Sequence, residues 1–217
     1  MSTVDFTVQE LSQGLKSLGL SATQEQETLL LDYLGLLQKW NKTYNLTSIR
    51  DPAMMLTHHL LDSLSVVQPL FKSCPEAKTL LDVGSGAGLP GVILALMCPH
   101  LSVTCVDAVG KKVAFVNQVA LTLQLPNLKA VHARVESLTT TFDVITSRAF
   151  SSLTDLLTCT LHLSKPDTQW MAMKAQIAEE ELTQVAQLAQ VFHVEPLLVP
   201  GLNAKRCIVW LRRLSVL

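Results

Sequence analysis

The sequence feature that most constrains the fold is a glycine-rich turn between two short apolar segments. The chain from Thr79 to Gly91 reads Thr-Leu-Leu-Asp-Val-Gly-Ser-Gly-Ala-Gly-Leu-Pro-Gly, with alternating glycines at Gly84, Gly86 and Gly88. The apolar run 80–83 predicts a strand, and the apolar run 92–97 predicts a helix. Strand, glycine turn and helix in this order allow a nucleotide-like ligand to approach the backbone closely, because glycine has no Cβ to collide with it.

A carboxylate follows the turn at the spacing expected for a ribose contact. The predicted strand 101–107 ends in Asp107, which comes 23 residues after Gly84 and 19 after Gly88. In a βαβ unit, an acid at this point lies beside the glycine turn and accepts hydrogen bonds from both ribose hydroxyls. The alternative is that Asp107 caps the helix predicted from Lys111 onward. The two roles are compatible, and the spacing favours the ribose.

The spacing of the glycines separates the possible cofactor classes. A dinucleotide fingerprint has the pattern G-x-G-x-x-G, whereas this turn reads G-x-G-x-G and continues with Leu89. A triphosphate-binding loop is excluded, because Gly-Lys-Ser/Thr does not occur. An acid two positions before the glycines, Asp82, resembles motif I of the class I S-adenosylmethionine-dependent methyltransferases. The lack of lysine near the glycines agrees, because this cofactor has no phosphates.

The first third of the chain predicts helices. Apolar spacing predicts a helix over 7–18, a second capped by Ser21 or Thr23 and running to Trp40, and a third from Asp51-Pro52 onward. We therefore expect two domains: an N-terminal helical cap over 1–70 and a Rossmann-like methyltransferase domain over 71–217. The connection 40–51 is interpreted mainly as a loop with Trp40 and Tyr44 in the core. A second interpretation turns Lys42, Tyr44, Asn45 and Arg50 toward a ligand.

Two histidines in the third helix are interpreted as packing or substrate-facing residues. His58 and His59 lie four and three positions before Asp62, on one helical face. A metal site would need a third ligand nearby, so no metal is predicted. We expect a histidine hydrogen-bonded to Asp62, with His58 free to point toward substrate.

The remaining pattern predicts an α/β fold with a seven-stranded, mostly parallel sheet. The expected strands are 128–132, 169–174, 192–198 and 206–210, with a fourth strand and its exit over 142–150, and the expected helices are 111–123, 155–163 and 179–190. At the end of the fourth strand, enzymes that methylate exocyclic amines carry Asn/Asp-Pro-Pro-aromatic, and carbon-methylating enzymes carry Pro-Cys. This chain has Ser147-Arg148-Ala149-Phe150 instead.

Four motifs together resemble one family in order and content. They are Trp40-Asn41-Lys42 with Tyr44-Asn45-Leu46-Thr47, then His59-Leu60-Leu61-Asp62-Ser63, then Asp82 to Gly91, then Ser147-Arg148-Ala149-Phe150. They are similar to the small-subunit ribosomal RNA methyltransferase G family. The resemblance implies S-adenosylmethionine as cofactor and ring nitrogen 7 of a guanine in the decoding region of bacterial 16S rRNA as target. It implies cofactor contacts at Gly84, Leu89, Val135, Glu136 and Arg148, to which the turn itself adds Gly86 and Asp107. Glu136 as a solvated loop acid is an equal alternative. Ala175 departs from the family's usual glycine after Lys174.

Methylation of nitrogen 7 needs no general base, because this atom has a free lone pair and no proton. Arg148 is therefore expected to position cofactor and guanine, since a guanidinium is always protonated. The net charge of -1 does not attract RNA, so local basic patches must. Residues 196–217 hold four basic side chains and no acid. The expected phosphate contacts are Lys39, Lys42, Arg50, Lys165, Lys174, Lys205 and Arg206.

Composition excludes several classes. Five scattered cysteines without Cys-x-x-Cys spacing favour reduced thiols and no zinc site. The apolar runs are too short to span a bilayer, and the N-terminus lacks a basic signal region. We expect a cytoplasmic monomer that acts on 16S rRNA within the small subunit or an assembly intermediate. The open alternatives are a methyltransferase for a small molecule or protein, a nicotinamide-dependent oxidoreductase and a non-enzymatic RNA-binding module.

Overall fold

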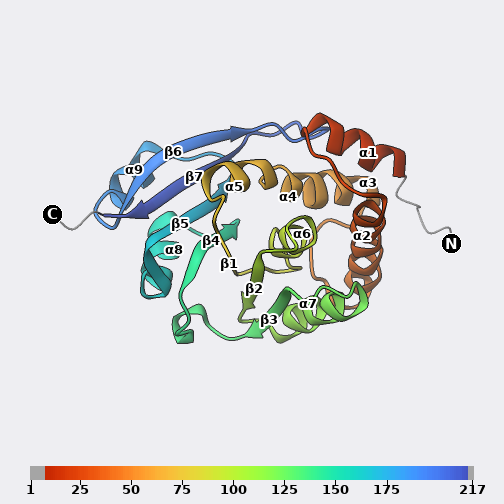
Figure 1. The fold of residues 1–217 in the computed structure, drawn as a ribbon, viewed down its shortest axis with the longest axis horizontal. Helices are drawn as coiled ribbons and strands as arrows, with labels where there is room; N and C mark the ends of the chain where they lie inside the picture. The colour runs from red at the N-terminus through yellow and green to blue at the C-terminus, as the bar shows by residue number, and fades with distance from the viewer. Residues whose placement is uncertain (1–7, 215–217) are drawn as a thin grey trace.

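The computed structural model describes residues 8–214, and a seven-stranded sheet runs through its centre (Figure 1). The strand order is β3-β2-β1-β4-β5-β7-β6. β7 pairs antiparallel with β5 and β6, and the other neighbouring pairs are parallel. The strands are β1 Thr79–Val83, β2 Ser102–Asp107, β3 Leu128–His132, β4 Phe142–Arg148, β5 Ser164–Lys174, β6 Ala189–Leu197 and β7 Arg206–Arg213. The predicted seven-stranded, mostly parallel sheet is confirmed.

Helices cover both faces of this sheet (Figure 1). α2, α6 and α7 lie on one side, and α8 and α9 on the other. The helices are α1 Val8–Ser17, α2 Gln24–Tyr44, α3 Pro52–Met55, η1 Leu56–Leu61, α4 Asp62–Leu64, α5 Val67–Ser73, α6 Gly91–Met97, α7 Gly110–Thr122, η2 Val135–Ser137, α8 Leu153–Thr160, η3 Leu161–Leu163 and α9 Glu179–Val185. The architecture is therefore a three-layer α/β sandwich.

The alternation of side chains along each strand produces two cores. Leu80 on β1 and Val144 on β4 face the core under α2, α6 and α7. Their chain neighbours, Leu81 and Ile145, face the opposite core under α8. This follows from the period of two in a strand, which sends successive side chains to opposite faces. Near-continuous apolar runs are what a parallel sheet buried on both faces requires.

Caps in the first third of the chain agree with the sequence. Thr23 caps α2 in a capping box with Gln26, and the Asp51 side chain accepts a hydrogen bond from the Ala53 amide with Pro52 at the first helical position. The first helix was predicted from Thr7, which lies outside the described residues; its described part begins at Val8.

Several elements differ from the prediction. The third helix is not regular, because Leu56–Leu61 forms a π-helical turn between α3 and α4. β5 begins five residues early, at Ser164. The helix predicted to Gln190 ends at Val185, and the last hairpin begins at Ala189 because Ala189 pairs with Arg213 on β7. Long-range pairing overrides local propensity here.

The two-domain division remains a prediction. Side chains from the helical segment, such as Leu34 and Leu60, share one buried cluster with Val92 of α6 and Met171 of β5. The helical segment therefore packs directly on the sheet layer and contributes to the same core.

Candidate active site

The glycine turn lies where the strand order reverses. β1 has β2 on one side and β4 on the other, and in open α/β sheets ligands bind at the carboxyl ends of the strands at such a switch point. The Gly84 amide donates to the Val106 carbonyl at 2.9 Å, and the Gly86 amide donates to Asp107 Oδ2 at 2.9 Å. The turn is thus held against the end of β2, as the spacing between Gly84 and Asp107 predicts.

The three glycines have different surroundings. Gly84 is exposed and Gly86 half-buried, whereas Gly88 is buried. A Cβ on Gly86 would have only the Gly84 carbonyl oxygen nearby, at 4.0 Å, but a Cβ on Gly88 would lie 2.4 Å from a Val92 methyl. The expectation that each glycine makes room for the ligand therefore needs correction at Gly88, where the close neighbour is α6.

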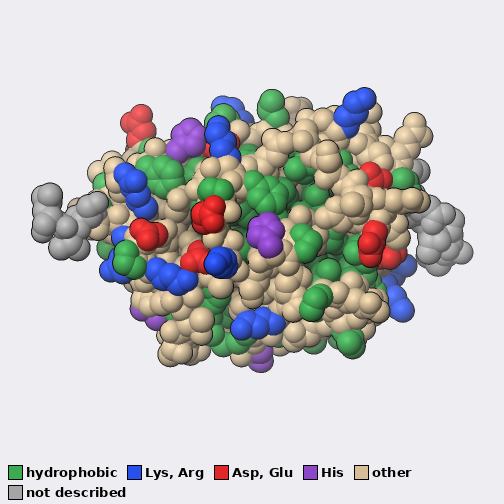
Figure 2. Space-filling model, viewed as in Figure 1, with side chains coloured by type: hydrophobic (Ala, Val, Ile, Leu, Met, Phe, Trp, Pro, Cys, Tyr) green, Lys and Arg blue, Asp and Glu red, His purple; other side chains and the backbone are tan. Residues whose placement is uncertain are grey.

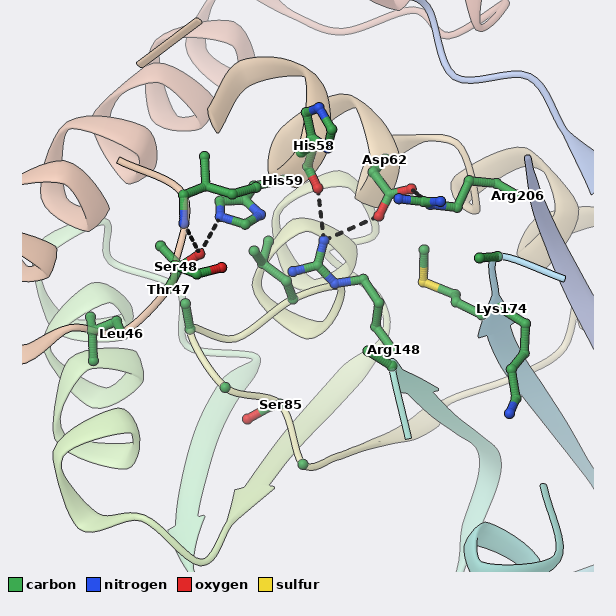
Figure 3. A pocket seen from close by; sticks show the side chains of 18 residues that line it. Leu46, Thr47, Ser48, His58, His59, Asp62, Ser85, Arg148, Lys174 and Arg206 are labelled. Atoms are coloured by element: carbon green, nitrogen blue, oxygen red, sulfur yellow. Dashed lines mark hydrogen bonds and ion pairs between the residues drawn. The ribbon is translucent and has the colours of Figure 1, made fainter. Parts of the chain in front are cut away.

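A pocket of about 520 Å³ opens in front of the turn (Figure 3). One wall is the turn itself, and the opposite wall comes from the loop after α2 and from the π-helical turn. The ends of β4 and β5 and the start of β7 complete it. The lining includes Thr47, His58, His59, Asp62, Gly84, Gly86, Leu89, Arg148, Met173, Lys174 and Arg206.

An acid joins two arginines across this pocket (Figure 3). Arg148 Nη1 donates to Asp62 Oδ2 at 3.1 Å and to the His58 carbonyl at 3.0 Å. Arg206 Nε donates to Asp62 Oδ1 at 3.0 Å. Asp62 is only 2 % exposed, so the acid shared by both ion pairs is shielded from water, while the two guanidiniums are partly exposed to the pocket. Sequence reasoning missed this role of Asp62, because its two partners lie 86 and 144 residues away along the chain.

The predicted histidine–Asp62 hydrogen bond is wrong. His59 Nε2 instead lies 2.8 Å from Thr47 Oγ1 in the loop after α2. Burial and the nearby charge of Arg148 lower the pKa of His59 to about 4, so its imidazole is neutral at physiological pH. His58 directs its carbonyl toward Arg148, while its ring points the other way (Figure 3).

Asp82, the acid before the glycines, has a structural role, because its hydrogen bond joins β1 to the start of α6. Asp82 is fully buried on β1, and its Oδ2 accepts a hydrogen bond from the Gly91 amide at the start of α6 at 2.8 Å. Burial raises the pKa of the Asp82 carboxyl to about 7. Asp82 therefore fixes the angle between β1 and α6, which in turn sets the shape of the turn.

The predicted adenosine contacts, Asp107, Val135 and Glu136, lie outside the lining of this pocket. Asp107 Oδ1 accepts a hydrogen bond from the Val109 amide at 2.8 Å, while α7 starts at Gly110 with no side-chain cap, so Asp107 is not its N-cap. Val135 and Glu136 belong to the short helix η2, and Val135 packs in the same cluster as Val106 of β2. Of these residues only Asp107 touches the turn, through the Gly86 amide, and the cofactor contacts of Asp107, Val135 and Glu136 remain predictions.

The predicted phosphate contacts do not form one surface. Lys42 and Arg50 line a separate pocket of about 290 Å³ with Gln38, Asn41 and Met55. Lys165 lies at the start of β5, whereas the main pocket lies at the end of that strand. Its ammonium is 2.6 Å from the carboxylate of Asp143. Lys165 therefore lies apart from Arg206, which lines the main pocket.

Two further cations at the pocket are already paired. Lys174 lines it, but its ammonium is 2.7 Å from Glu181 and its side chain turns away from Arg148 (Figure 3). Arg206 is bound to Asp62.

The remaining predicted residues lie outside the pocket lining. Lys205 and Lys39 are exposed. In the loop region, Trp40 packs on Phe115 as expected, whereas Tyr44 is largely exposed.

Metal sites, membrane-spanning helices and disulfides are absent from the described residues. Over residues 8–214, no group of three His, Cys, Asp or Glu side chains is arranged to bind a metal ion. Within the same range no helix is both long and apolar enough to cross a membrane. The five cysteines, all within this range, are unpaired.

A family model described as rRNA small subunit methyltransferase G matches residues 26–209. The chain belongs to this family. It is 55% identical over 207 residues to the "Ribosomal RNA small subunit methyltransferase G" of Methylibium petroleiphilum, with 94% of each chain covered. It is 54% identical to the protein of the same name from Polaromonas sp., covering 94% of this chain and 92% of the relative.

Solved structures agree in fold at low identity. An S-adenosylmethionine-dependent methyltransferase from Aquifex aeolicus superimposes with a TM-score of 0.57 at 18% identity, covering 76% of this chain and 94% of that one. The N-methyltransferase NodS from Bradyrhizobium japonicum, solved with S-adenosylhomocysteine, has a TM-score of 0.57 at 14% identity, covering 83% and 97%. Family and fold confirm the prediction of a class I S-adenosylmethionine-dependent methyltransferase.

Proposed function

We propose that this protein methylates ring nitrogen 7 of a guanine in the decoding region of bacterial 16S rRNA, with S-adenosylmethionine as methyl donor. Family membership supports a small-subunit rRNA substrate. We further propose that the enzyme works in the cytoplasm, because its substrate is ribosomal, and that it does so as a monomer. In this proposal the helical cap, residues 1–70, faces the RNA, and residues 71–217 hold the cofactor.

The glycine turn fits this cofactor. The open space at Gly86 leaves room for a ligand against the backbone. Gly84, Gly86 and Leu89 would contact the methionine part, and Asp107 the ribose. Val135 and Glu136 would lie against the adenine, as in the family resemblance. Residues 84–91 contain no Lys or Arg, which suits a cofactor without phosphates.

The observation that carries the choice of a ring nitrogen concerns the groups that could act as a base among the described lining residues. Their one carboxylate, Asp62, and the ring of His59 are both engaged, and the ring of His58 points away from Arg148 (Figure 3). Asp62 is bound to two guanidiniums, and His59 is paired with Thr47 with its pKa lowered to about 4 by burial. Bound S-adenosylmethionine supplies an electrophilic methyl group, which leaves sulfur for nitrogen 7 without any proton transfer. Arg148 would hold the guanine in line with the methyl group and the sulfur.

Methyl transfer from labelled cofactor tests this function. Wild-type protein is incubated with small subunits that lack the modification, with naked 16S rRNA and with a small-molecule extract, and the labelled nucleoside is identified after digestion. We expect 7-methylguanosine in 16S rRNA. We also expect Arg148→Ala to lower kcat/KM about a hundredfold, because positioning is lost. Label in another nucleoside, or only in small molecules or protein, would overturn the proposal.

We propose that the pocket lined by Lys42 and Arg50 contacts the phosphates of the substrate RNA. It lies on the helical segment, beside the loop that lines the main pocket. The net charge of -1 gives no overall attraction to RNA, and Figure 2 shows basic and acidic side chains interspersed on the face that it draws. Replacing both residues by Ala should weaken binding of small subunits and flatten the slope of log K against log salt by about 1.5, the loss expected for two phosphate contacts.

A matched pair of charges at the other edge of the sheet is the control. Lys78 directly precedes β1, and Lys165 is the second residue of β5, so both lie away from the pocket. The double variant Lys78→Ala, Lys165→Ala removes two positive charges, as the Lys42 and Arg50 double variant does. Equal slopes for the two double variants would mean that only the net charge matters, and the proposed RNA site would be wrong.

A further inference from the structure

Asp62 is a single buried acid between two arginines of the pocket wall. Its two carboxylate oxygens accept from different guanidiniums, Oδ2 from Arg148 at 3.1 Å and Oδ1 from Arg206 at 3.0 Å. Arg148 is the last residue of β4 and Arg206 the first of β7, while Asp62 begins α4. One side chain of the helical segment therefore ties together two strand ends that line the cofactor pocket.

The local backbone aims Asp62 at this position. Asp62 directly follows the π-helical turn Leu56–Leu61, and π turns are uncommon and frequent at functional sites. The same turn directs the His58 carbonyl to Arg148 Nη1. The guanidinium of Arg148 is thus held by one carbonyl and one carboxylate from the same irregular helical segment.

The charges at this wall do not cancel. The two guanidiniums carry two positive charges, and Asp62 supplies one negative charge. Among the other described lining residues, Lys174 is paired with Glu181, and His59 is neutral at physiological pH because burial lowers its pKa to about 4. Without Asp62, the wall would present two uncompensated positive charges to any ligand.

We propose that Asp62 is a positioning residue that holds Arg148 and Arg206 at the cofactor pocket and offsets their charge, so that the pocket accepts a sulfonium cation. This inference rests on the proposed function. S-adenosylmethionine carries one more positive charge than S-adenosylhomocysteine, which is otherwise the same molecule without the transferred methyl. The ratio of their affinities therefore reports the charge of the wall, whereas a general destabilisation of the fold would lower both affinities by the same factor.

Calorimetric titration of both ligands tests the proposal. Asp62→Asn keeps the shape of the side chain and removes its charge. We expect it to lower the affinity for S-adenosylmethionine about tenfold more than the affinity for S-adenosylhomocysteine. The matched control is Asp32→Asn, the same change at an exposed position of α2, which should leave the ratio as in wild type. Equal weakening of the two ligands by Asp62→Asn, or no weakening, would overturn the proposal.

A second variant keeps the test valid if Asp62→Asn folds poorly. Arg206→Gln removes one positive charge from the same wall and should shift the ratio in the opposite direction, toward S-adenosylmethionine. A ratio that does not move, or moves the other way, would contradict the charge role. Failure of the proposed function has a different signature: the wild-type protein would then bind neither ligand or would not methylate rRNA.

Discussion

Gly86→Asp is expected to reduce the affinity for S-adenosylmethionine by at least about a hundredfold, while the protein stays folded. A Cβ at Gly86 would have only the Gly84 carbonyl oxygen nearby, at 4.0 Å, so the new side chain would enter open space at the turn. Its carboxylate would occupy the channel that we assign to the methionine part of the cofactor. The φ of 59° at Gly86 is one that Asp tolerates better than most residues, so the cost in folding free energy is small, about 1 kcal/mol.

Calorimetric titration measures the affinity, and urea unfolding measures the stability of the same preparation. Gly86→Ala is the control, because a methyl group fills much less of the channel at a comparable backbone cost. Retention of wild-type affinity by the folded Gly86→Asp variant would show that the cofactor does not lie against this turn.

Gly88→Ala is expected to have the opposite profile, with a large loss of stability. A Cβ there would lie 2.4 Å from Val92 Cγ2 and 3.0 Å from Val116 Cγ2, at a φ of 83°. The left-handed conformation costs about 1–2 kcal/mol for an L residue, and overpacking of a dense core adds about 1–3 kcal/mol. We therefore expect the free energy of unfolding to fall by about 3 kcal/mol or more.

Urea denaturation of Gly88→Ala beside Gly86→Ala isolates the packing contribution. Both substitutions place Ala at positive φ, but only the Gly88 position is closely surrounded by side chains. If the two variants lost the same free energy, the close contact of the turn with α6 and α7 would not matter for stability.

These two glycines show how far a sequence pattern can be interpreted. The alternation of Gly84, Gly86 and Gly88 predicts a turn that approaches a ligand, and that turn is present at the end of β1. The pattern does not distinguish a glycine that leaves room for a ligand from one that leaves room for a helix. That difference depends on Val92 and Val116 approaching from α6 and α7.

Local signals also predicted most of the elements correctly. The Thr23 cap, the Asp51-Pro52 helix start and the apolar strand runs depend on neighbouring residues and were found in place. The π-helical turn at Leu56–Leu61 was missed, because its apolar spacing resembles that of an ordinary helix. The early start of β6 was missed because it depends on pairing with β7.

The α/β class and the turn at Gly84–Gly88 follow from the amino-acid sequence, and the cofactor follows from it through family resemblance. The partners of the charged residues became known only from the three-dimensional structure: Arg148 and Arg206 meet at Asp62, whereas Lys174 and Lys165 pair with Glu181 and Asp143. The two groups of features differ in the separation of the contacting residues along the chain. Helices, strands and turns follow from contacts a few residues apart, but the ion pair between Asp62 and Arg206 joins residues 144 positions apart and exists only once the sheet has brought them together.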